Sequence, residues 1–308
     1  MNRCPITYRP CQGSYSEKGL KLLSRNLADL KPLPFSSIEL RQEAAAMAGK
    51  ISIQGVQPKL SARLMVKEQR FELVDTLGHY ILKPQIADYR EVPENEDLTM
   101  RMAATAGINV PLHGMVYGKD REFTYFIRRF DRTPRNGKIH VEDFAQLAQE
   151  SRDTKYRSSM EKVVGILDAF CTFPMVEKLK LFKIVLFCFL VGNEDMHLKN
   201  FSVIRKGDLI ALSPAYDLLN TTIILARPEE ELALPLNGKK NRLNRQDFID
   251  YFGCNRLKLT DKAIAKVLSR LEEQKISWDE LISNSFLSTE MRKRYLALLE
   301  SRFKRLFS

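Results

Sequence analysis

Residues 191–220, VGNEDMHLKNFSVIRKGDLIALSPAYDLLN, contain a short hairpin pattern with polar loops on both sides. Two strand-like runs within residues 201–214 are joined by a turn sequence around Gly207. Apolar helical patterns precede and follow this segment, so the hairpin is predicted to lie inside a mainly helical part of the chain. The loops that flank the hairpin contain three candidate functional side chains: Asp195, Asn200 and Asp217.

An aspartate, an asparagine five residues later, a hairpin and a second aspartate follow each other as in the catalytic and metal-binding segment of protein kinases. There the first aspartate accepts the proton of the substrate hydroxyl, while the asparagine and the second aspartate hold Mg²⁺. The residue types suit these tasks, because a hydroxyl needs a nearby proton acceptor and Mg²⁺ prefers hard oxygen ligands. The spacing of Asp195 and Asn200 alone is common in loops. Their placement with Asp217 around a hairpin is what favours a kinase-like site.

The pattern of the chain changes near residue 130. Before it, helices are predicted after Ser36-Ser37, ending at Gly49, and over 94–107, and strands over 51–57, 62–74, 79–84, 112–118 and 123–130. After it, helical periods cover 142–149, 158–170, 175–192, 244–252, 261–274 and 288–306. The pattern predicts an α+β protein with a strand-rich N-lobe, residues 1–130, a mainly helical C-lobe, residues 131–308, and a cleft between the two.

Lys83 ends an apolar strand pattern, HYILKP (79–84), in the predicted N-lobe. A kinase carries its phosphate-pairing lysine on such a strand and orients it with a glutamate of the next helix. Glu96, thirteen residues further on, is a candidate for that glutamate, and Glu94 competes with it. The alternatives are an exposed lysine at a strand edge and a glutamate that only complements the helix dipole.

Two glycine-containing turns are weaker signals. ISIQGVQPKL (51–60) lacks both GxGxxG and GxxxxGKS/T, so its composition alone predicts a hairpin turn and not a phosphate loop. NGKKNRLNR (237–245) begins with an Asn-Gly turn and is strongly basic. It is predicted as a solvated loop, with contact to an anionic substrate or to DNA as the alternative.

The 308 residues carry 49 lysines and arginines against 38 aspartates and glutamates, a formal charge of +11. This balance fits an anionic partner or a well-solvated surface equally. Five cysteines without a CxxC pair argue against a zinc ribbon or a disulfide scaffold and are typical of reduced thiols in the cytoplasm. The most apolar run, 179–192, contains Lys183 and is too short to span a bilayer, so it is predicted as a buried core helix. Because the N-terminus lacks a secretory signal, we expect a soluble cytoplasmic protein without membrane contact.

Six stretches in one order resemble the HipA family of bacterial serine/threonine kinase toxins: SIQGVQPKL (52–60), YILKP (80–84), PENE (93–96), FIRRFDR (126–132), GNEDMHLKNFS (192–202) and LSPAYDLL (212–219). The resemblance implies a two-lobed protein-kinase-like fold that binds ATP and Mg²⁺ in its cleft. By that resemblance Asp195 is the catalytic residue and Glu96 orients Lys83. The metal ligands would be Asn200 and Asp217. The implied ATP-binding residues are Gln54, Gly55, Val56, Gln57, Pro58, Lys59, Lys83, Arg128, Arg129, Phe130, His197, Leu198, Lys199, Asn200, Tyr216 and Asp217.

The sequence departs from related kinases in two respects. The segments that read HRD and DFG in eukaryotic-type kinases read NED and YDL here, and no APE follows. About 50 residues precede the glycine loop, fewer than in full-length HipA, which resembles the short toxin HipT of tripartite HipBST systems. That likeness implies a small HipS-like partner and a helix-turn-helix HipB-like antitoxin, through which contact with DNA is indirect. It also implies autophosphorylation at Ser52, with Gln54 standing where a second loop serine can occur.

We therefore expect an ATP-dependent protein serine/threonine kinase that acts as the toxin of a toxin–antitoxin system. By resemblance its protein substrate is a translation component such as an aminoacyl-tRNA synthetase. Two alternatives stay open: a catalytically idle, pseudokinase-like binding subunit of a repressor complex, and a small-molecule phosphotransferase with the same site. The idle subunit is disfavoured because the residues that a degenerate kinase loses are all present: Lys83, Asp195, Asn200 and Asp217.

Overall fold

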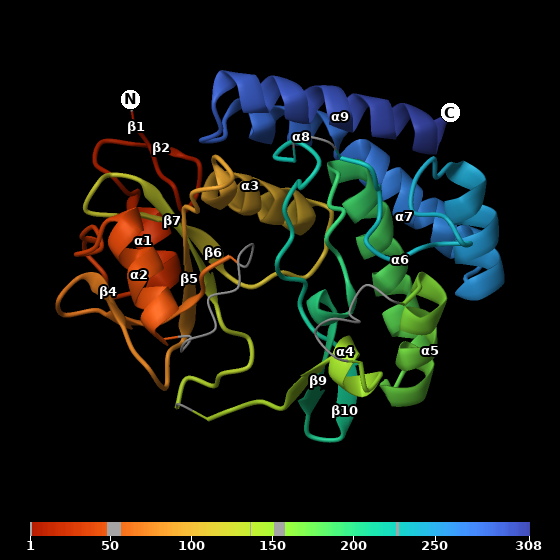
Figure 1. The fold of residues 1–308 in the computed structure, drawn as a ribbon, viewed down its shortest axis with the longest axis horizontal. Helices are drawn as coiled ribbons and strands as arrows, with labels where there is room; N and C mark the ends of the chain where they lie inside the picture. The colour runs from red at the N-terminus through yellow and green to blue at the C-terminus, as the bar shows by residue number, and fades with distance from the viewer. Residues whose placement is uncertain (1, 48–56, 136, 151–157, 226–227) are drawn as a thin grey trace. The chain divides into compact units, whose positions relative to one another are not determined.

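The computed structural model describes residues 2–47, 57–135, 137–150, 158–225 and 228–308 (Figure 1). The chain divides into two compact units, each made of several segments. Unit 1 comprises Met1–Leu98, Pro111–Asn136 and Asn284–Ser288, and unit 2 comprises Thr99–Val110, Gly137–Ser283 and Thr289–Ser308. The domain limits expected from the sequence, 1–130 and 131–308, are kept as a proposal.

Unit 1 contains a five-stranded antiparallel sheet in the order β4-β3-β5-β7-β6. Its strands are β3 Leu60–Met65, β4 Arg70–Leu73, β5 Tyr80–Pro84, β6 His113–Tyr117 and β7 Phe123–Arg128. Strands β5 and β7 are rich in aromatic and β-branched residues, which pack well on a half-buried pleated surface. The strands predicted at 79–84, 112–118 and 123–130 are confirmed as β5, β6 and β7.

The run 62–74 was expected as one strand, and this expectation is wrong. The run forms the end of β3, a turn and β4, with Arg63 opposite Glu72 across the hairpin. Gln69 adopts a left-handed conformation at φ 57° in the turn. The polar residues before β4 break the alternation that a continuous half-buried strand requires. The strand expected at 51–57 falls on residues 51–56, outside the described part of the chain, and on Gln57, which is not in a strand.

The N-terminal part of unit 1 packs on the sheet. Two short strands, β1 Asn2–Arg3 and β2 Pro10–Cys11, form an antiparallel ribbon. Helix α1, Glu17–Leu23, follows, and the hydroxyl of Ser16 caps it by accepting the Gly19 N–H. Helix α2, Ser37–Met47, confirms the helix expected after Ser36-Ser37, whereas its expected end at Gly49 lies outside the described residues. Buried side chains of these elements and of the sheet form one core, including Leu20, Leu40, Leu82 and Phe126.

Unit 2 is mainly helical and contains one three-stranded antiparallel sheet in the order β10-β9-β8. Its strands are β8 Val141–Asp143, β9 Ser202–Lys206 and β10 Leu209–Leu212. Its helices are α4 Phe144–Leu147, α5 Met160–Phe170, α6 Pro174–Val191, the 3-10 helix η1 Leu198–Asn200, the π-helix η2 Asp247–Arg256, α7 Asp261–Glu273, α8 Lys275–Ser283 and α9 Thr289–Phe307. The hairpin expected within 201–214 is confirmed as β9–β10, and the two units together confirm the α+β class.

Helix α6 forms the centre of unit 2. Twelve of its 18 residues are buried, and the helix contacts α5, α7, α9, η2 and β10 (Figure 1). This burial on all sides confirms the core helix predicted for the apolar run 179–192. The helix starts at Pro174, whose fixed φ suits the first turn, and ends at Gly192 in a left-handed conformation.

Helix α3, Val92–Thr105, begins in unit 1 and ends in unit 2. It confirms the helix expected over 94–107, and Gly107 follows it with a φ of 74°.

Other helical predictions in unit 2 hold only in part. The helices at 158–170, 261–274 and 288–306 are confirmed as α5, α7 and α9. The expected helix at 142–149 is wrong over residues 142–143, which belong to β8, and only one turn, α4, follows. Asp143 ends the strand and starts the helical turn. Its carboxylate accepts the Gln146 amide, and its own amide donates to the Gln146 side-chain oxygen. The helix expected at 244–252 is instead a π-helix, η2, and α8 was not expected.

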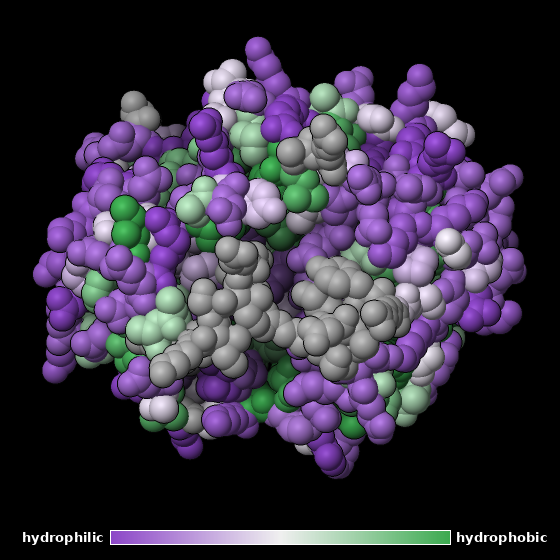
Figure 2. Space-filling view, in the orientation of Figure 1, coloured by the Kyte–Doolittle hydropathy of each residue, from purple (hydrophilic) through white to green (hydrophobic). Residues whose placement is uncertain are grey.

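The apolar residues lie mostly inside the cores. Hydrophilic residues predominate on the face shown in Figure 2, and apolar residues gather there in small groups. Phe173 and Ile276 are exceptions, with exposed fractions of 61% and 75%. Within the described ranges, no helix combines the length and apolarity that crossing a membrane requires.

Gly192 provides a test of how α6 ends. A Cβ at this position would lie 2.4 Å from Leu298 Cδ2 and 2.8 Å from Thr222 Oγ1, on a backbone with φ 70°. We expect Gly192→Ala to lower the free energy of unfolding by about 1–3 kcal/mol, because strain and overlap act together. Gly165→Ala is the matched control, since Gly165 lies inside α5 with nothing within 4 Å of its added Cβ. It should gain about 0.5–1 kcal/mol in urea unfolding. Equal stabilities of the two variants would contradict this account.

Candidate functional site

The loop between α6 and β9 holds the backbone of Asp195 while leaving its carboxylate accessible. The Asn200 side chain donates Nδ2 to the Asp195 carbonyl oxygen at 2.8 Å, and the His197 amide donates to the same oxygen at 2.8 Å. The Asp195 amide donates to Asn193 Oδ1 at 3.2 Å. The Asp195 side chain is nevertheless 44% exposed. A carboxylate on a fixed backbone is thus presented at the surface of this loop.

The buried helix η1 positions the remaining residues of this loop. Leu198 is completely buried, and Asn200 ends the helix with 8% exposure. Because Asn200 uses Nδ2 toward Asp195, its Oδ1 branch is directed to the other side of the amide. His197 is buried, and its Nε2 lies 3.9 Å from Asp195 Oδ1, beyond hydrogen-bond distance.

Asp217 follows the hairpin in a left-handed conformation, with φ 55°. Few residues other than glycine adopt this conformation, and aspartate is among the more tolerant. The neighbouring Tyr216 donates its hydroxyl to the Lys199 carbonyl at 2.9 Å and lies 2.5 Å from Ser202 Oγ. Burial raises the pKa of the Tyr216 phenol, which keeps it protonated as a donor. Tyr216 therefore ties the Asp217 loop to helix η1.

The end of α6 joins both loops of this half of the site. The Gly192 carbonyl accepts hydrogen bonds from the Thr222 amide at 3.1 Å and from the hydroxyls of Thr221 at 3.1 Å and Thr222 at 3.0 Å. The Thr221 oxygen also accepts the Glu194 amide at 2.8 Å. The segments that carry Asp195 and Asp217 are thus fixed to one point of unit 2.

In unit 1, Lys83 and Glu96 form a buried ion pair. Their side chains are 2% and 0% exposed. Lys83 lies on the central strand β5, and its Nζ is 5.5 Å from the ring centre of Tyr125 on the neighbouring β7. The alternative interpretation of Lys83 as an exposed lysine at a strand edge is therefore wrong. Glu94 was the other candidate for orienting Lys83. Burial raises the pKa of Glu94 to about 8, and the negative charge of nearby carboxylates also raises it.

A second buried polar contact lies beside this pair and was not expected. Asp97, next to Glu96 on α3, places Oδ1 3.0 Å from Nδ1 of His113 on β6. The His113 ring centre is 5.9 Å from that of Tyr125, whose face Lys83 approaches. Helix α3 is thus held to the sheet of unit 1 by adjacent acidic side chains.

The end of β7 carries the residues expected to face adenine. Arg128 is exposed, with its guanidinium 5.9 Å from the Tyr80 ring centre. Arg129 follows the strand and binds the Asp131 carboxylate through two hydrogen bonds of 3.0 and 2.8 Å. Phe130 is half-buried in the turn after the strand.

Only part of the expected phosphate-covering loop belongs to the described chain. Gln57, Pro58 and Lys59 lead into β3, and Lys59 is exposed. The remaining loop candidates lie outside the described residues: Ser52, Gln54, Gly55 and Val56.

The sequence family described as the HipA-like C-terminal domain matches residues 51–278, well over half of the chain. The chain belongs to the HipA-like family. The matched range includes all of the candidate site residues discussed above.

Relatives of this HipA-like chain carry kinase names. It is 28% identical over 322 residues to a candidate kinase of Haemophilus influenzae, covering 93% of this chain and 92% of that protein. It is 36% identical over 194 residues to the candidate kinase Y4dM of Sinorhizobium fredii, covering 58% and 47%. It is 27% identical over 210 residues to the serine/threonine-protein kinase toxin HipA of Shewanella oneidensis, covering 62% and 47%. The chain thus spans about half the length of the latter two relatives.

Solved structures confirm the kinase-like fold. Shewanella oneidensis HipA, in a complex with HipB and operator DNA, matches with a TM-score of 0.72 and 22% identity, over 91% of this chain and 73% of that one. The proinflammatory kinase CtkA of Helicobacter pylori matches with a TM-score of 0.54 and 16% identity, over 73% and 86%. The α+β, protein-kinase-like fold expected from the sequence is therefore confirmed.

A charged network of unit 2 includes Glu194, the neighbour of Asp195, and no sequence motif predicts it. Arg302 of α9 is buried, lies 3.1 Å from Glu231 Oε1 and packs 4.7 Å from the Phe189 ring centre. Arg305 also binds Glu231, at 3.0 Å to Oε2. Burial raises the pKa of Glu194, the neighbour of Asp195, to about 7, while Arg302 acts in the opposite direction.

The pKa of Glu194 predicts a dependence of stability on pH. The ordinary value is 4.5, so the folded protein disfavours the ionised form, and this penalty is absent below about pH 4.5 and complete above about pH 7. Glu194→Gln removes the penalty and should raise the Tm relative to the parent protein more at pH 8 than at pH 5, by roughly 2 °C. The exposed Glu280 gives the control variant, Glu280→Gln. A difference in Tm that is the same at both pH values would refute the assignment.

Proposed function

We propose that this HipA-like protein is an ATP-dependent protein serine/threonine kinase that acts as a toxin. The observation that carries the proposal is the Asp195 loop, in which Asn193 and Asn200 hold the backbone and leave the carboxylate accessible. A carboxylate in this setting can accept the proton of a substrate hydroxyl as that hydroxyl attacks the phosphoryl group. Relatives named as kinases, including a HipA toxin, support the same reaction class.

ATP and Mg²⁺ are the proposed cofactors. Asn200 Oδ1 and the Asp217 carboxylate are hard oxygen donors on the loops that flank β9–β10, and they suit Mg²⁺. In the described part of the chain, no group of three or more His, Cys, Asp or Glu side chains could hold a metal ion alone. Mg²⁺ commonly completes its shell with phosphate oxygens and water. When bound, the ion neutralises charge on the transferring phosphoryl group.

The nucleotide contacts are proposed on the residues that the family resemblance implies. Lys83, oriented by Glu96, would pair with phosphate oxygens, as the lysine on the corresponding strand of protein kinases does. The proposed contacts also include the loop from Gln54 to Lys59, the segment Arg128–Phe130, and His197, Leu198, Lys199 and Tyr216. In the structure Tyr216 and Leu198 act through packing and hydrogen bonds inside unit 2.

The proposed partners follow from the toxin role. The structural neighbour from Shewanella oneidensis is a complex of HipA, HipB and operator DNA, which supports a HipB-like antitoxin for this chain, with DNA reached through it. We further propose a HipT-like subtype with a small HipS-like partner, a translation component such as an aminoacyl-tRNA synthetase as substrate, and the cytoplasm as the site of action.

Two variants separate catalysis from metal binding. Asp195→Asn removes the proton acceptor and should lower phosphoryl transfer to protein by about 10²- to 10⁴-fold, while calorimetric binding of ATP with Mg²⁺ is kept. Asp217→Ala should weaken the Mg²⁺-dependent part of ATP binding itself. Undiminished transfer by Asp195→Asn would refute the kinase assignment of this loop, and unchanged metal dependence in Asp217→Ala would refute the metal site.

Autophosphorylation at Ser52 is the proposed regulation. A phosphate adds about −1.5 to −2 charge at pH 7, which would repel a bound triphosphate or, without ATP, pair with Lys59 or Lys83. Phosphorylated protein should therefore bind ATP more weakly and lose activity. Mass spectrometry after incubation with ATP should find one phosphate in the segment 51–60, at Ser52, and none in Ser52→Ala. An active enzyme with an unmodified Ser52 would contradict this switch.

A further inference from the structure

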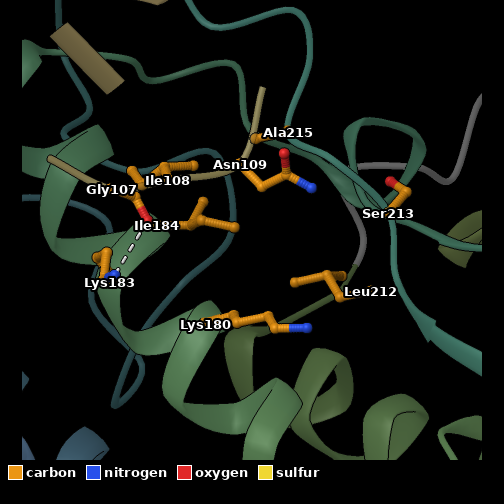
Figure 3. A pocket seen from close by; sticks show the side chains of 9 residues that line it. All are labelled: Gly107, Ile108, Asn109, Lys180, Lys183, Ile184, Leu212, Ser213 and Ala215. Atoms are coloured by element: carbon orange, nitrogen blue, oxygen red, sulfur yellow. Dashed lines mark hydrogen bonds between the residues drawn. The ribbon is translucent and has the colours of Figure 1, made fainter. Parts of the chain in front are cut away.

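Unit 2 contains a cavity of about 250 Å³ that does not include Asp195, Asn200 or Asp217 among its lining residues (Figure 3). One side of it is the segment Gly107–Asn109, which follows α3. Helix α6 contributes Lys180, Lys183 and Ile184 on another side. The end of β10 and the chain after it contribute Leu212, Ser213 and Ala215. The volume suits a small molecule, since pockets for drug-sized ligands are larger.

One of the lining lysines, Lys183, carries a positive charge without an acidic partner among the described residues. Lys183 donates from Nζ to the Gly107 carbonyl at 3.1 Å (Figure 3). Arg270, which does not line the cavity, donates from Nε to the Ala106 carbonyl at 3.0 Å. Burial, and then repulsion by Arg270 and Lys266, lower the pKa of Lys183. No carboxylate of the described residues forms an ion pair with Lys183. An ammonium has three N–H donors, so Lys183 keeps donors beyond its bond to Gly107.

Lys180, one turn earlier on α6, is already neutralised. Its Nζ lies 2.9 Å from both carboxylate oxygens of Glu177. Glu177 is buried and also accepts the Leu212 amide at 3.0 Å. The net charge that a ligand meets therefore comes from Lys183.

The rest of the cavity is mainly apolar. Its apolar walls are buried side chains with exposed fractions of 6% for Ile108, 5% for Ile184 and 7% for Leu212. The amide of Asn109 lies across from the two lysines of α6 in Figure 3 and offers a polar contact. An inorganic anion would leave the apolar walls without contact, and a neutral apolar molecule would leave Lys183 without an anion.

We propose that this cavity binds a small organic carboxylate, with Lys183 as the counter-ion of its carboxylate group and the apolar walls around its body. The ligand would lie against the chain that leads to Asp217. The Asn109 carbonyl accepts the Ala215 amide at 2.8 Å, two residues before Asp217. Occupancy would thereby stabilise the segment on which the proposed metal ligand stands.

Ligand-detected NMR titration of the full chain with benzoate tests the site, with benzamide and inorganic phosphate as comparison probes. Benzamide keeps the shape and lacks the charge, whereas phosphate keeps the charge and lacks the apolar body. Benzoate should bind more tightly than either. Lys183→Met should weaken benzoate binding by about tenfold or more, as expected for a charged hydrogen bond. Lys183→Arg should restore most of it.

Lys304→Met is the matched control, because Lys304 is an exposed lysine of α9 that does not line the cavity. It should leave benzoate binding unchanged. Lys183→Met is expected to fold, since the folded state disfavours the charge that it removes, and thermal melting checks this. Absence of benzoate binding, equal binding of benzamide or phosphate, or unchanged binding in Lys183→Met would overturn the proposal. Because no readout depends on phosphoryl transfer, these failures are distinct from a failure of the proposed kinase function.

Discussion

The left-handed backbone of Gly192 sets the geometry of the C-terminal half of the site. Helix α6 is buried on nearly all sides, so its axis and its end are determined by packing. The chain must leave this helix within the space between Leu298, Thr222 and Asn220, where no Cβ fits. The Gly192 carbonyl then accepts three hydrogen bonds from Thr221 and Thr222. One residue thus connects the core helix, the loop of Asp195 and the segment after Asp217.

In unit 1 the main constraint is a pair of charged side chains, Lys83 and Glu96, in the buried interior. Burying Lys83 and Glu96 costs desolvation energy that their attraction offsets only with good geometry. The Tyr125 face adds a favourable contact for the ammonium, and the neighbouring Asp97 binds His113 on the sheet. Well-packed apolar residues would stabilise a fold at least as well. These buried charges are therefore better explained by the position in which Glu96 holds Lys83 than by a gain in stability.

The parts of the molecule that the sequence predicts are those with local physical causes. The β9–β10 hairpin follows from a turn sequence between apolar runs, and the Asp195–Asn200 spacing lies within one loop, so both could be recognised without distant contacts. The place of Lys83 at the end of an apolar strand pattern is also local, whereas the central position of that strand comes from its pairing with β3 and β7. The contacts between Arg302 and Glu231 and between Asp97 and His113 join separate elements, and no spacing rule identifies them. The hairpin within 62–74 was missed because its polar turn has neither glycine nor proline.

The conformation of Asp217 is a consequence of these distant contacts. A non-glycine residue at φ 55° is strained by about 1–2 kcal/mol, and such strain persists only where the surroundings fix the chain. Here they fix it on both sides. Before Asp217, the Ala215 amide binds the Asn109 carbonyl and the Tyr216 hydroxyl binds the Lys199 carbonyl. After it, Thr221 and Thr222 bind Gly192. With both flanks anchored inside unit 2, the backbone of Asp217 is held in the left-handed conformation by contacts of its neighbours.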